Sequence, residues 1–172
     1  TLNECLMKWA AQFLPKPEDR GQTTISLDGK TIRSTTGMKN MSSPLHIIGA
    51  QICELGITLA SETVADKSNE IPAVQRLLEK MDIEGCIVVA DAMHCQQKTA
   101  EIIVDGKGDY LLDAKGNQSS LETEISEYVL DSSLRDGMDS SRTKEKNRDR
   151  IETRTAYTTG DISWLYGKEK WK

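Results

Sequence analysis

Two carboxylates stand where a metal-dependent reaction could be carried out. Asp28 follows the apolar, β-rich residues 24–27, and Asp91 follows the apolar residues 86–90. Ligands of open α/β sheets gather beyond the carboxyl ends of strands, so the two side chains converge if these strands are neighbours. Carboxylate oxygens suit Mg²⁺, and a pair of such ions can clamp both oxygens in phosphoryl transfer. If the strands lie apart, each Asp is an ordinary turn or capping residue.

Basic and amide side chains form two further candidate sites. Lys115, Asn117 and Gln118 follow an expected strand and could reach phosphates or base edges, although a solvated turn has the same pattern. Residues 142–154 hold six basic and three acidic side chains. This stretch could follow a DNA backbone, or it could be a solvated charged face.

Several other chemistries lack their signatures. The Gly-Lys-Thr at 29–31 resembles the end of a phosphate-binding loop, but position 24 is Thr where the first glycine should stand. His46 and His94 are the only histidines, too few for most histidine-rich metal sites. The four cysteines show no C-x-x-C spacing, so neither a zinc ribbon nor a thioredoxin site is indicated.

The composition is that of an ordinary globular protein. The chain has 172 residues, 37% of them hydrophobic and 28% charged, with a formal net charge of −5 at pH 7. Net acidity argues against binding nucleic acid by bulk charge but leaves room for a local basic groove. We expect no membrane partner, because no apolar run approaches the roughly 20 residues that span a bilayer. The chain also starts without a signal peptide, so we expect a cytoplasmic protein with reduced thiols.

The elements that must position these residues follow from periodicity and turn residues. We expect helices at 2–13, 71–81, 96–104 and after Ser119, where Glu122 completes a capping box. Strands are expected at 24–28, 45–53, 57–65, 86–91, 110–114 and 151–159, and loops at 34–44 and 131–149. This order predicts an α/β layer architecture with mixed strand directions.

Five segments in this order resemble the transposases of bacterial insertion sequences, of the type that includes the H-repeat-associated proteins of Rhs elements. The segments are ISLDGKTIR at 25–33, DKSNEI at 66–71, DAMHCQ at 91–96, DY with KGNQ between 109 and 118, and RIETR at 150–154. Each segment alone is weak evidence, but five in order are specific. Together they span nearly the whole chain.

The resemblance implies a ribonuclease-H-like fold: a mixed five-stranded sheet of order 3-2-1-4-5 flanked by helices, with the start of a β-rich insertion at the C-terminus. The first and fourth strands are then neighbours, which would place Asp28 beside Asp91. The family uses an acidic DDE triad that holds two Mg²⁺ (or Mn²⁺) ions for DNA cleavage and strand transfer. Asp28 and Asp91 would be the first two acids. His94 stands where the family more usually has glycine.

The third acid departs from the family pattern. In relatives, the catalytic Glu lies on a helix after a β-rich insertion, in a segment resembling His-Trp-x-Ile-Glu-Asn, and this sequence has no such segment. Glu152 is the one motif Glu left. Its neighbours Arg150 and Arg154 would share its face of a strand, which favours a charge-paired strand residue over a triad member. We therefore expect a fragment with little activity of its own.

The resemblance also suggests a division of the chain and a set of partners. We expect the end of an N-terminal helical segment at 1–18, the catalytic core at 19–130, and a charged loop with the start of the insertion at 131–172. The partners would be insertion-sequence ends and target DNA in a bacterial cytoplasm, at the nucleoid when bound, with a homo-oligomer left open. The residues expected to contact DNA are Lys30, Arg33, Lys67, Asn69, Lys115, Asn117, Gln118, Arg148, Arg150 and Arg154.

Two other functions remain open from the sequence. The chain could be a non-catalytic remnant that binds DNA or a full-length transposase, in which case binding would ignore Asp28→Asn and Asp91→Asn. It could also be a general metal-dependent nuclease on the same fold, which would cut DNA without regard to element ends.

Overall fold

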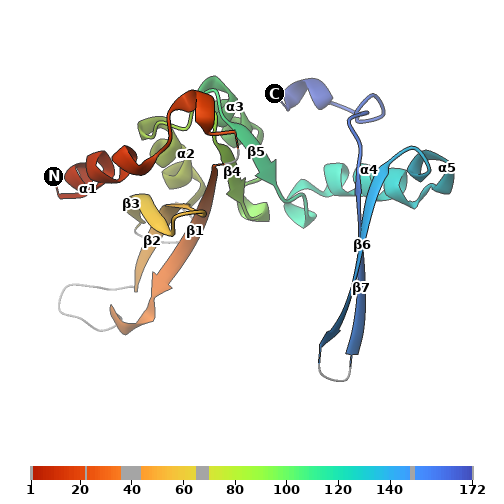
Figure 1. The fold of residues 1–172 in the computed structure, drawn as a ribbon, viewed down its shortest axis with the longest axis horizontal. Helices are drawn as coiled ribbons and strands as arrows, with labels where there is room; N and C mark the ends of the chain where they lie inside the picture. Colours follow the sequence, from red (N-terminus) through yellow and green to blue (C-terminus); the bar gives the residue numbers. More distant parts are fainter. Residues whose placement is uncertain (1, 22, 36–43, 65–69, 148–149, 172) are drawn as a thin grey trace. The chain divides into compact units, whose positions relative to one another are not determined.

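The computed structural model describes residues 2–21, 23–35, 44–64, 70–147 and 150–171. The chain forms two compact units, one of Thr1–Asp113 with Trp171–Lys172 and one of Ala114–Lys170 (Figure 1). Of the helices in the described part, none combines the length and apolarity that crossing a bilayer requires.

A mixed five-stranded sheet forms the centre of the first unit. Its strands are β1 (Thr24–Ile32), β2 (Leu45–Ile52), β3 (Ile57–Val64), β4 (Ile87–Ala90) and β5 (Asp109–Leu112). The order is β3-β2-β1-β4-β5, with β1 antiparallel to β2 and parallel to β4. This order and the flanking helices confirm the expected α/β fold, consistent with a ribonuclease-H-like transposase core.

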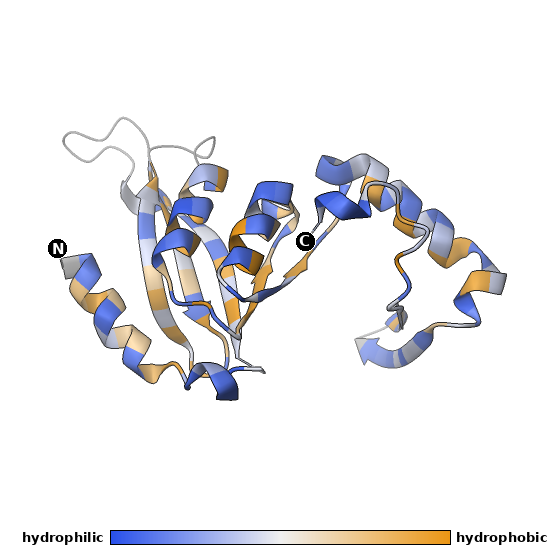
Figure 2. Cartoon of the chain, turned by 90° about the horizontal axis from the view of Figure 1, so that it is seen from above, coloured by the Kyte–Doolittle hydropathy of each residue, from blue (hydrophilic) through white to orange (hydrophobic). Residues whose placement is uncertain are grey.

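Helices cover the sheet through apolar stripes. α2 (Glu70–Lys80) buries Ala73, Val74, Leu77 and Leu78, which lie at the three- and four-residue spacing of one helix face. α3 (Gln97–Asp105) packs beside α2 and against β5, and Figure 2 shows both on the same side of the sheet. α1 (Leu2–Ala10) lies along the edge strand β3, which shields that edge from further pairing.

β1 is longer than the sequence suggests, and the prediction that it ends at Asp28 is wrong. Its parallel pairing with β4 stops at Leu27, whereas its antiparallel pairing with β2 continues to Ile32, opposite Leu45. β1 therefore has two partners up to Leu27 and one partner beyond it. Asp28 marks the end of the parallel pairing rather than the end of the strand.

The second unit contains helices and a long two-stranded sheet. α4 (Ser119–Leu130) forms as expected, but no side chain caps its N-terminus, so the predicted capping box is absent among the described contacts. Tyr128 on α4 stacks on Trp164 with ring centroids 4.2 Å apart. The short α5 (Ser132–Arg135) follows.

The predicted loop at 131–149 is wrong over most of its described length. β6 (Asp139–Asn147) pairs with β7 (Arg150–Thr158) along all nine residues of each strand. Most side chains of this hairpin are exposed, so it lacks the alternation of apolar and polar residues that normally indicates a strand. Of the other predicted loop, at 34–44, residues 36–43 lie outside the described part.

Candidate active site

Asp28 and Asp91 occupy matching positions on two neighbouring parallel strands. Leu27 and Ala90 are the last paired residues of β1 and β4, and each is followed directly by one of the two aspartates. Neighbouring strands lie about 4.8 Å apart, so the two backbones are close at this point. Both aspartates are exposed. The register therefore brings the two backbones side by side, and the convergence of the two side chains stays a prediction.

Each aspartate has a defined local setting. Asp91 caps the 3₁₀ turn η5 (Ala92–His94), and its Oδ1 accepts a hydrogen bond of 3.2 Å from the Met93 amide. Asp28 lines a groove of about 330 Å³ on the sheet, together with Ser26 and Lys30 from its own strand. Lys30 therefore brings a cation close to the first acid.

A third carboxylate, that of Asp113, stands at the corresponding point of the next strand, β5. Leu112 on β5 pairs with Ala90, so Asp113 follows the last pair of β4 and β5 as Asp91 does. The sequence pattern placed Asp113 inside a strand, so this relationship was not predicted. Burial raises the pKa of the nearby Cys95 thiol, and the negative charge of Asp113 raises it further.

The donor chemistry of Asp28 and Asp91 fits a hard divalent cation. Mg²⁺ is commonly held by one or two carboxylates, with waters and substrate phosphates completing its octahedron. Among the described residues, no group of three or more His, Cys, Asp or Glu side chains is placed to hold a metal ion. The two aspartates have the donor chemistry for part of such a site, and the site itself stays a prediction.

A buried polar cluster lies next to Asp91 and over Gly29, the residue that follows Asp28, and the sequence pattern did not predict it. The Glu70 carboxyl group has Oε2 at 2.9 Å from His46 Nε2 and Oε1 at 3.4 Å from His94 Nε2. His46 Nδ1 is 2.9 Å from the hydroxyl of Thr31 on β1. These contacts join the start of α2 to β1, β2 and η5, the segments that flank both aspartates.

Gly29 leaves the space that the cluster occupies. A Cβ at this position would meet Glu70 Oε1 and lie 3.1 Å from His46 Nε2. The Asp-Gly pair of the first motif therefore combines an acid with a residue small enough to admit Glu70. The sequence signal for this arrangement was the Gly after Asp28 together with an acid at the start of the next helix.

His94 links the cluster to the second acid. Its side chain is 2% exposed, and its Nε2 is 4.0 Å from Asp91 Oδ1 as well as near Glu70. Its Nδ1 has no hydrogen-bond partner among the described residues. His94 is the last residue of the turn that Asp91 caps, so a buried imidazole lies between Asp91 and Glu70.

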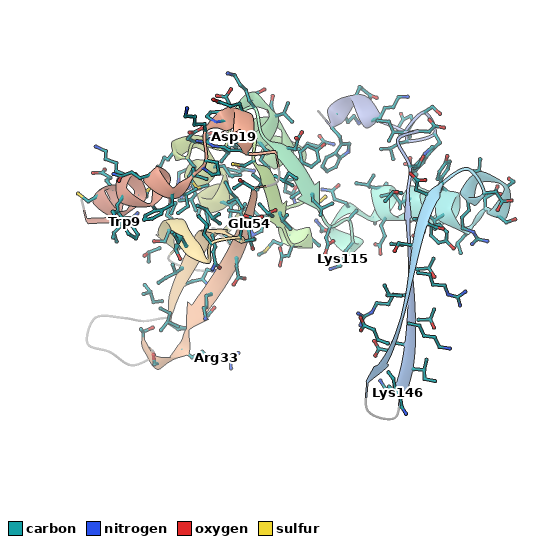
Figure 3. All side chains as sticks on the ribbon, in the orientation of Figure 1. Trp9, Asp19, Arg33, Glu54, Lys115 and Lys146 are labelled. Carbon is teal, nitrogen blue, oxygen red and sulfur yellow. The ribbon has the colours of Figure 1, made fainter. Side chains whose placement is uncertain are left out.

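The residues expected to contact DNA are distributed over both units. Lys30 and Arg33 are exposed on β1 and on the turn that follows it, and Figure 3 labels Arg33 at that end. The second unit carries the others that are described: Lys115, Asn117 and Gln118 in and beside the turn η6 (Gly116–Gln118), and Arg150 and Arg154 on β7. Lys67, Asn69 and Arg148 lie outside the described residues.

Glu152 is engaged by a neighbouring arginine. Arg154 Nη2 lies 2.8 Å from Glu152 Oε2, and Arg154 Nη1 lies 3.7 Å from Glu145 Oε2. This is the charge-paired arrangement that the alternating Arg-x-Glu-x-Arg sequence suggested. Glu152 belongs to the second unit, whereas Asp28 and Asp91 belong to the first.

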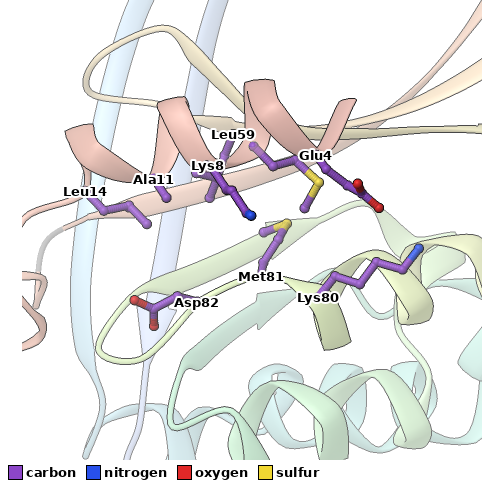
Figure 4. A pocket seen from close by; sticks show the side chains of 9 residues that line it. Glu4, Lys8, Ala11, Leu14, Leu59, Lys80, Met81 and Asp82 are labelled. Atoms are coloured by element: carbon purple, nitrogen blue, oxygen red, sulfur yellow. The ribbon is translucent and has the colours of Figure 1, made fainter. Parts of the chain in front are cut away.

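A larger pocket, of about 500 Å³, lies elsewhere in the first unit (Figure 4). α1, β3 and the end of α2 form it, largely with apolar side chains such as Met7, Leu59 and Met81. Its charged groups are exposed at the rim. The pocket has none of the converging buried polar groups expected of an active site.

Comparison with known proteins identifies one family. Residues 20–166 match the family model described as "Transposase DDE domain". An uncharacterized protein of the dhlA 3′ region in Xanthobacter autotrophicus is 35% identical over 86% of this chain and 50% of its own length. A candidate transposase of Escherichia coli O157:H7, YncI, is 37% identical over 76% of this chain and 34% of its own length.

The H-repeat type is also represented among the relatives. A candidate H repeat-associated transposase of Escherichia coli K12, YhhI, is 32% identical over 88% of this chain and 40% of its own length. The chain therefore spans half or less of each of these three relatives. No solved structure matched the sequence.

Proposed function

The chain belongs to the transposase DDE domain family, and we propose that it forms the part of a catalytic core that supplies the first two metal-binding acids. The observation that supports this most directly is the register of β1 and β4, in which Asp28 and Asp91 follow the same last pair. In the full-length protein, the reaction would be cleavage and strand transfer of DNA phosphodiesters at insertion-sequence ends, within the bacterial nucleoid.

Asp28 and Asp91 would hold Mg²⁺ or Mn²⁺, two ions in the complete site. When bound, such ions activate an attacking water or 3′-hydroxyl and offset the negative charge of the transition state. Asp91 is oriented for this role by its hydrogen bond from Met93. Lys30 lines the same groove as Asp28, which supports a role in contacting a backbone phosphate. Arg33 extends the same exposed strand end.

The third acid of the triad is not supplied by Glu152 in this proposal. Its carboxylate is already paired with Arg154, and freeing it would leave that guanidinium without its closest partner. The resemblance places the catalytic Glu in a His-Trp-x-Ile-Glu-Asn segment that these 172 residues do not contain. We therefore expect the chain alone to lack strand-transfer activity, because loss of an acid from such a site removes much of the charge stabilisation.

Metal binding tests the two-acid site directly. Titration of the chain with Mn²⁺, followed by electron paramagnetic resonance, is expected to show binding that Asp28→Asn and Asp91→Asn each weaken at least about tenfold. Asp109→Asn is the matched control, because Asp109 is an exposed acid at the first residue of β5. The last residue of β5, Leu112, is the one that lies beside the end of β4 and Asp91. An equal loss of Mn²⁺ affinity in all three variants would contradict a metal site at Asp28 and Asp91.

Activity of the longer parent protein tests the reaction. Cleavage of insertion-sequence ends with Mg²⁺ should be lost in Asp91→Asn and kept in Glu152→Gln. Loss of cleavage in Glu152→Gln would instead make Glu152 the third acid. Cleavage of any DNA without regard to element ends would favour the general nuclease. A protein that binds DNA but neither cleaves it nor binds Mn²⁺ would favour a non-catalytic remnant.

A further inference from the structure

The two faces of the β6–β7 hairpin differ in charge. In an antiparallel pair, residues directly opposite each other point to the same face, and alternate residues along one strand share a face. The register pairs Arg142 with Thr155, Lys144 with Thr153 and Lys146 with Ile151. The hairpin's side chains can therefore be assigned to two faces from the register alone.

One face, here called the basic face, is defined by Arg142, Lys144 and Lys146. Opposite them stand Thr155, Thr153 and Ile151, so this part of the face holds three cations and no acid. All three cations are exposed, and none forms an ion pair with another described residue. Figure 3 labels Lys146 near the far end of the hairpin, where the side chains project outward.

The other face, here called the paired face, carries its own counter-charges. It holds Arg150 and Arg154 together with Asp139, Glu145 and Glu152. The ion pairs of Arg154 to Glu152 on the same strand and to Glu145 across the ladder confirm that these three side chains share a face. Here the acids outnumber the cations by three to two.

The basic face continues to the end of the hairpin that adjoins α5. Tyr157 stands two residues from Thr155 on the same face, and the Arg135 guanidinium lies 5.6 Å from the centre of its ring. A guanidinium on an aromatic face is held in place while its outer N–H groups remain available. Arg135 thus adds a fourth cation to the basic face, at the end of the hairpin that adjoins α5.

We propose that the basic face binds the phosphate backbone of duplex DNA, and that the paired face makes little contribution. This proposal rests on the proposed function, which makes DNA the partner. Alternate residues of a strand lie roughly 6.8 Å apart, so the three cations form a row of regularly spaced charges along one strand. A two-stranded ribbon also fits the major groove, which is about 12 Å wide.

The side chains favour duplex over single-stranded DNA. Binding of single strands relies on aromatic platforms for unstacked bases, and the one ring on this face, Tyr157, is covered by Arg135. The residues opposite the cations are mostly threonines, whose hydroxyls are suited to phosphate oxygens. Of the basic stretch 142–154 expected from the sequence to contact DNA, the proposal thus assigns the contacts to Arg142, Lys144 and Lys146 rather than to Arg150 and Arg154.

Two variants that lose the same charge separate the faces. One carries Lys144→Gln with Lys146→Gln, and the other carries Arg150→Gln with Arg154→Gln. Binding of each chain to a fluorescent DNA duplex is measured by anisotropy between 50 and 200 mM NaCl in EDTA. The basic-face variant should flatten the slope of log affinity against log salt by about 1.8, because each phosphate contact contributes about 0.9. The paired-face variant should leave the slope nearly unchanged.

Equal changes in both variants, or a larger change in the paired-face variant, would overturn the proposal. Tighter binding to a single-stranded oligonucleotide or to duplex RNA than to duplex DNA would also overturn it. Circular dichroism of both variants checks that the hairpin is retained. Because EDTA removes divalent ions, failure of the Asp28 and Asp91 site would show in Mn²⁺ binding and leave this measurement intact.

Discussion

Glu70 Oε2 lies 2.9 Å from His46 Nε2, a contact between residues 24 positions apart that joins the first turn of α2 to β2. Both side chains are nearly buried, at 5% and 4% exposed. Buried polar groups of this kind rigidify their surroundings when their partners are satisfied. The contact therefore helps to fix the end of the β1–β2 ladder, the ladder that carries Asp28.

Removing the Glu70 carboxyl group should destabilise the first unit strongly. Glu70→Ala leaves the His46 imidazole without its carboxylate and leaves His94 with only the Asp91 carboxylate at 4.0 Å. The cost is about 1–3 kcal/mol for each buried group that loses its partner. Glu70→Gln keeps the shape and one acceptor, so it should cost less. Urea unfolding followed by circular dichroism measures both. Equal stability of Glu70→Ala and the wild type would contradict the importance of the cluster.

Gly29→Ala should be destabilising because of the same carboxyl group. The added methyl would overlap Glu70 Oε1, and overpacking of this kind costs roughly 1–3 kcal/mol. Gly49→Ala is the matched control: Gly49 is opposite Asp28 on β2, and a Cβ there meets nothing within 4 Å. We expect Gly49→Ala to be neutral or slightly stabilising. Similar thermal midpoints for the two variants would contradict this account.

Arg20 should be a further stabilising residue of the first unit. Its buried guanidinium donates to the carbonyls of Pro15 (2.6 Å) and Glu84 (3.1 Å) and to Asp82 Oδ2 (2.9 Å). Arg20→Met leaves two carbonyls without this donor, so we expect a loss on the order of 2–4 kcal/mol in urea unfolding. Lys16→Met is the control, because it removes an exposed cation from the same segment and should have little effect.

The Arg20–Asp82 pair should also give a pH dependence. The hydrogen bond from Arg20 lowers the pKa of the Asp82 carboxyl, so this contribution is present above the unfolded pKa of about 3.9 and is lost as the pH falls through the folded value. The stability difference between wild type and Asp82→Asn should therefore narrow below about pH 4. A difference that stays constant from pH 7 to pH 2 would show that the Asp82 charge is not involved.

The four cysteines should divide into two reactivity classes. Cys5 and Cys53 are exposed, whereas Cys86 and Cys95 are buried, and burial raises the pKa of both buried thiols. Since the thiolate is the reactive form, a disulfide reagent at pH 8 should modify two thiols quickly and two slowly. In guanidinium chloride all four should react alike. Four fast thiols in the native protein would contradict the burial of this part of the core.

The sequence carried enough information to predict the sheet, whereas the role of Asp28 and Asp91 as its first two acids stays a prediction. The apolar residues before Asp28 and Asp91 identified both strands, and the resemblance supplied their adjacency, which the register of β1 and β4 confirms. The continuation of β1 to Ile32 could not be predicted in this way. This continuation depends on pairing with β2, and β2 begins 13 residues later in the chain, at Leu45.

Contacts between distant residues explain the other differences. The sequence around Glu70 does not predict His46 or His94 as its partners, because the three residues come into contact only after β2, α2 and η5 pack together. The β6 strand escaped prediction for another reason: both faces of its hairpin are polar, so no apolar alternation marks the strand. Its charges are arranged by cross-strand pairing, which one strand alone does not reveal.

The β6–β7 sheet contains two strands, so in the described part of the chain each strand has one unpaired edge. Such edges offer free N–H and C=O groups to a strand from another molecule, and charged side chains discourage that pairing. Lys144 and Lys146 would then keep copies of the protein apart when no DNA is bound. Replacing them with apolar residues should promote edge-to-edge association, which is why glutamine suits the binding experiment better.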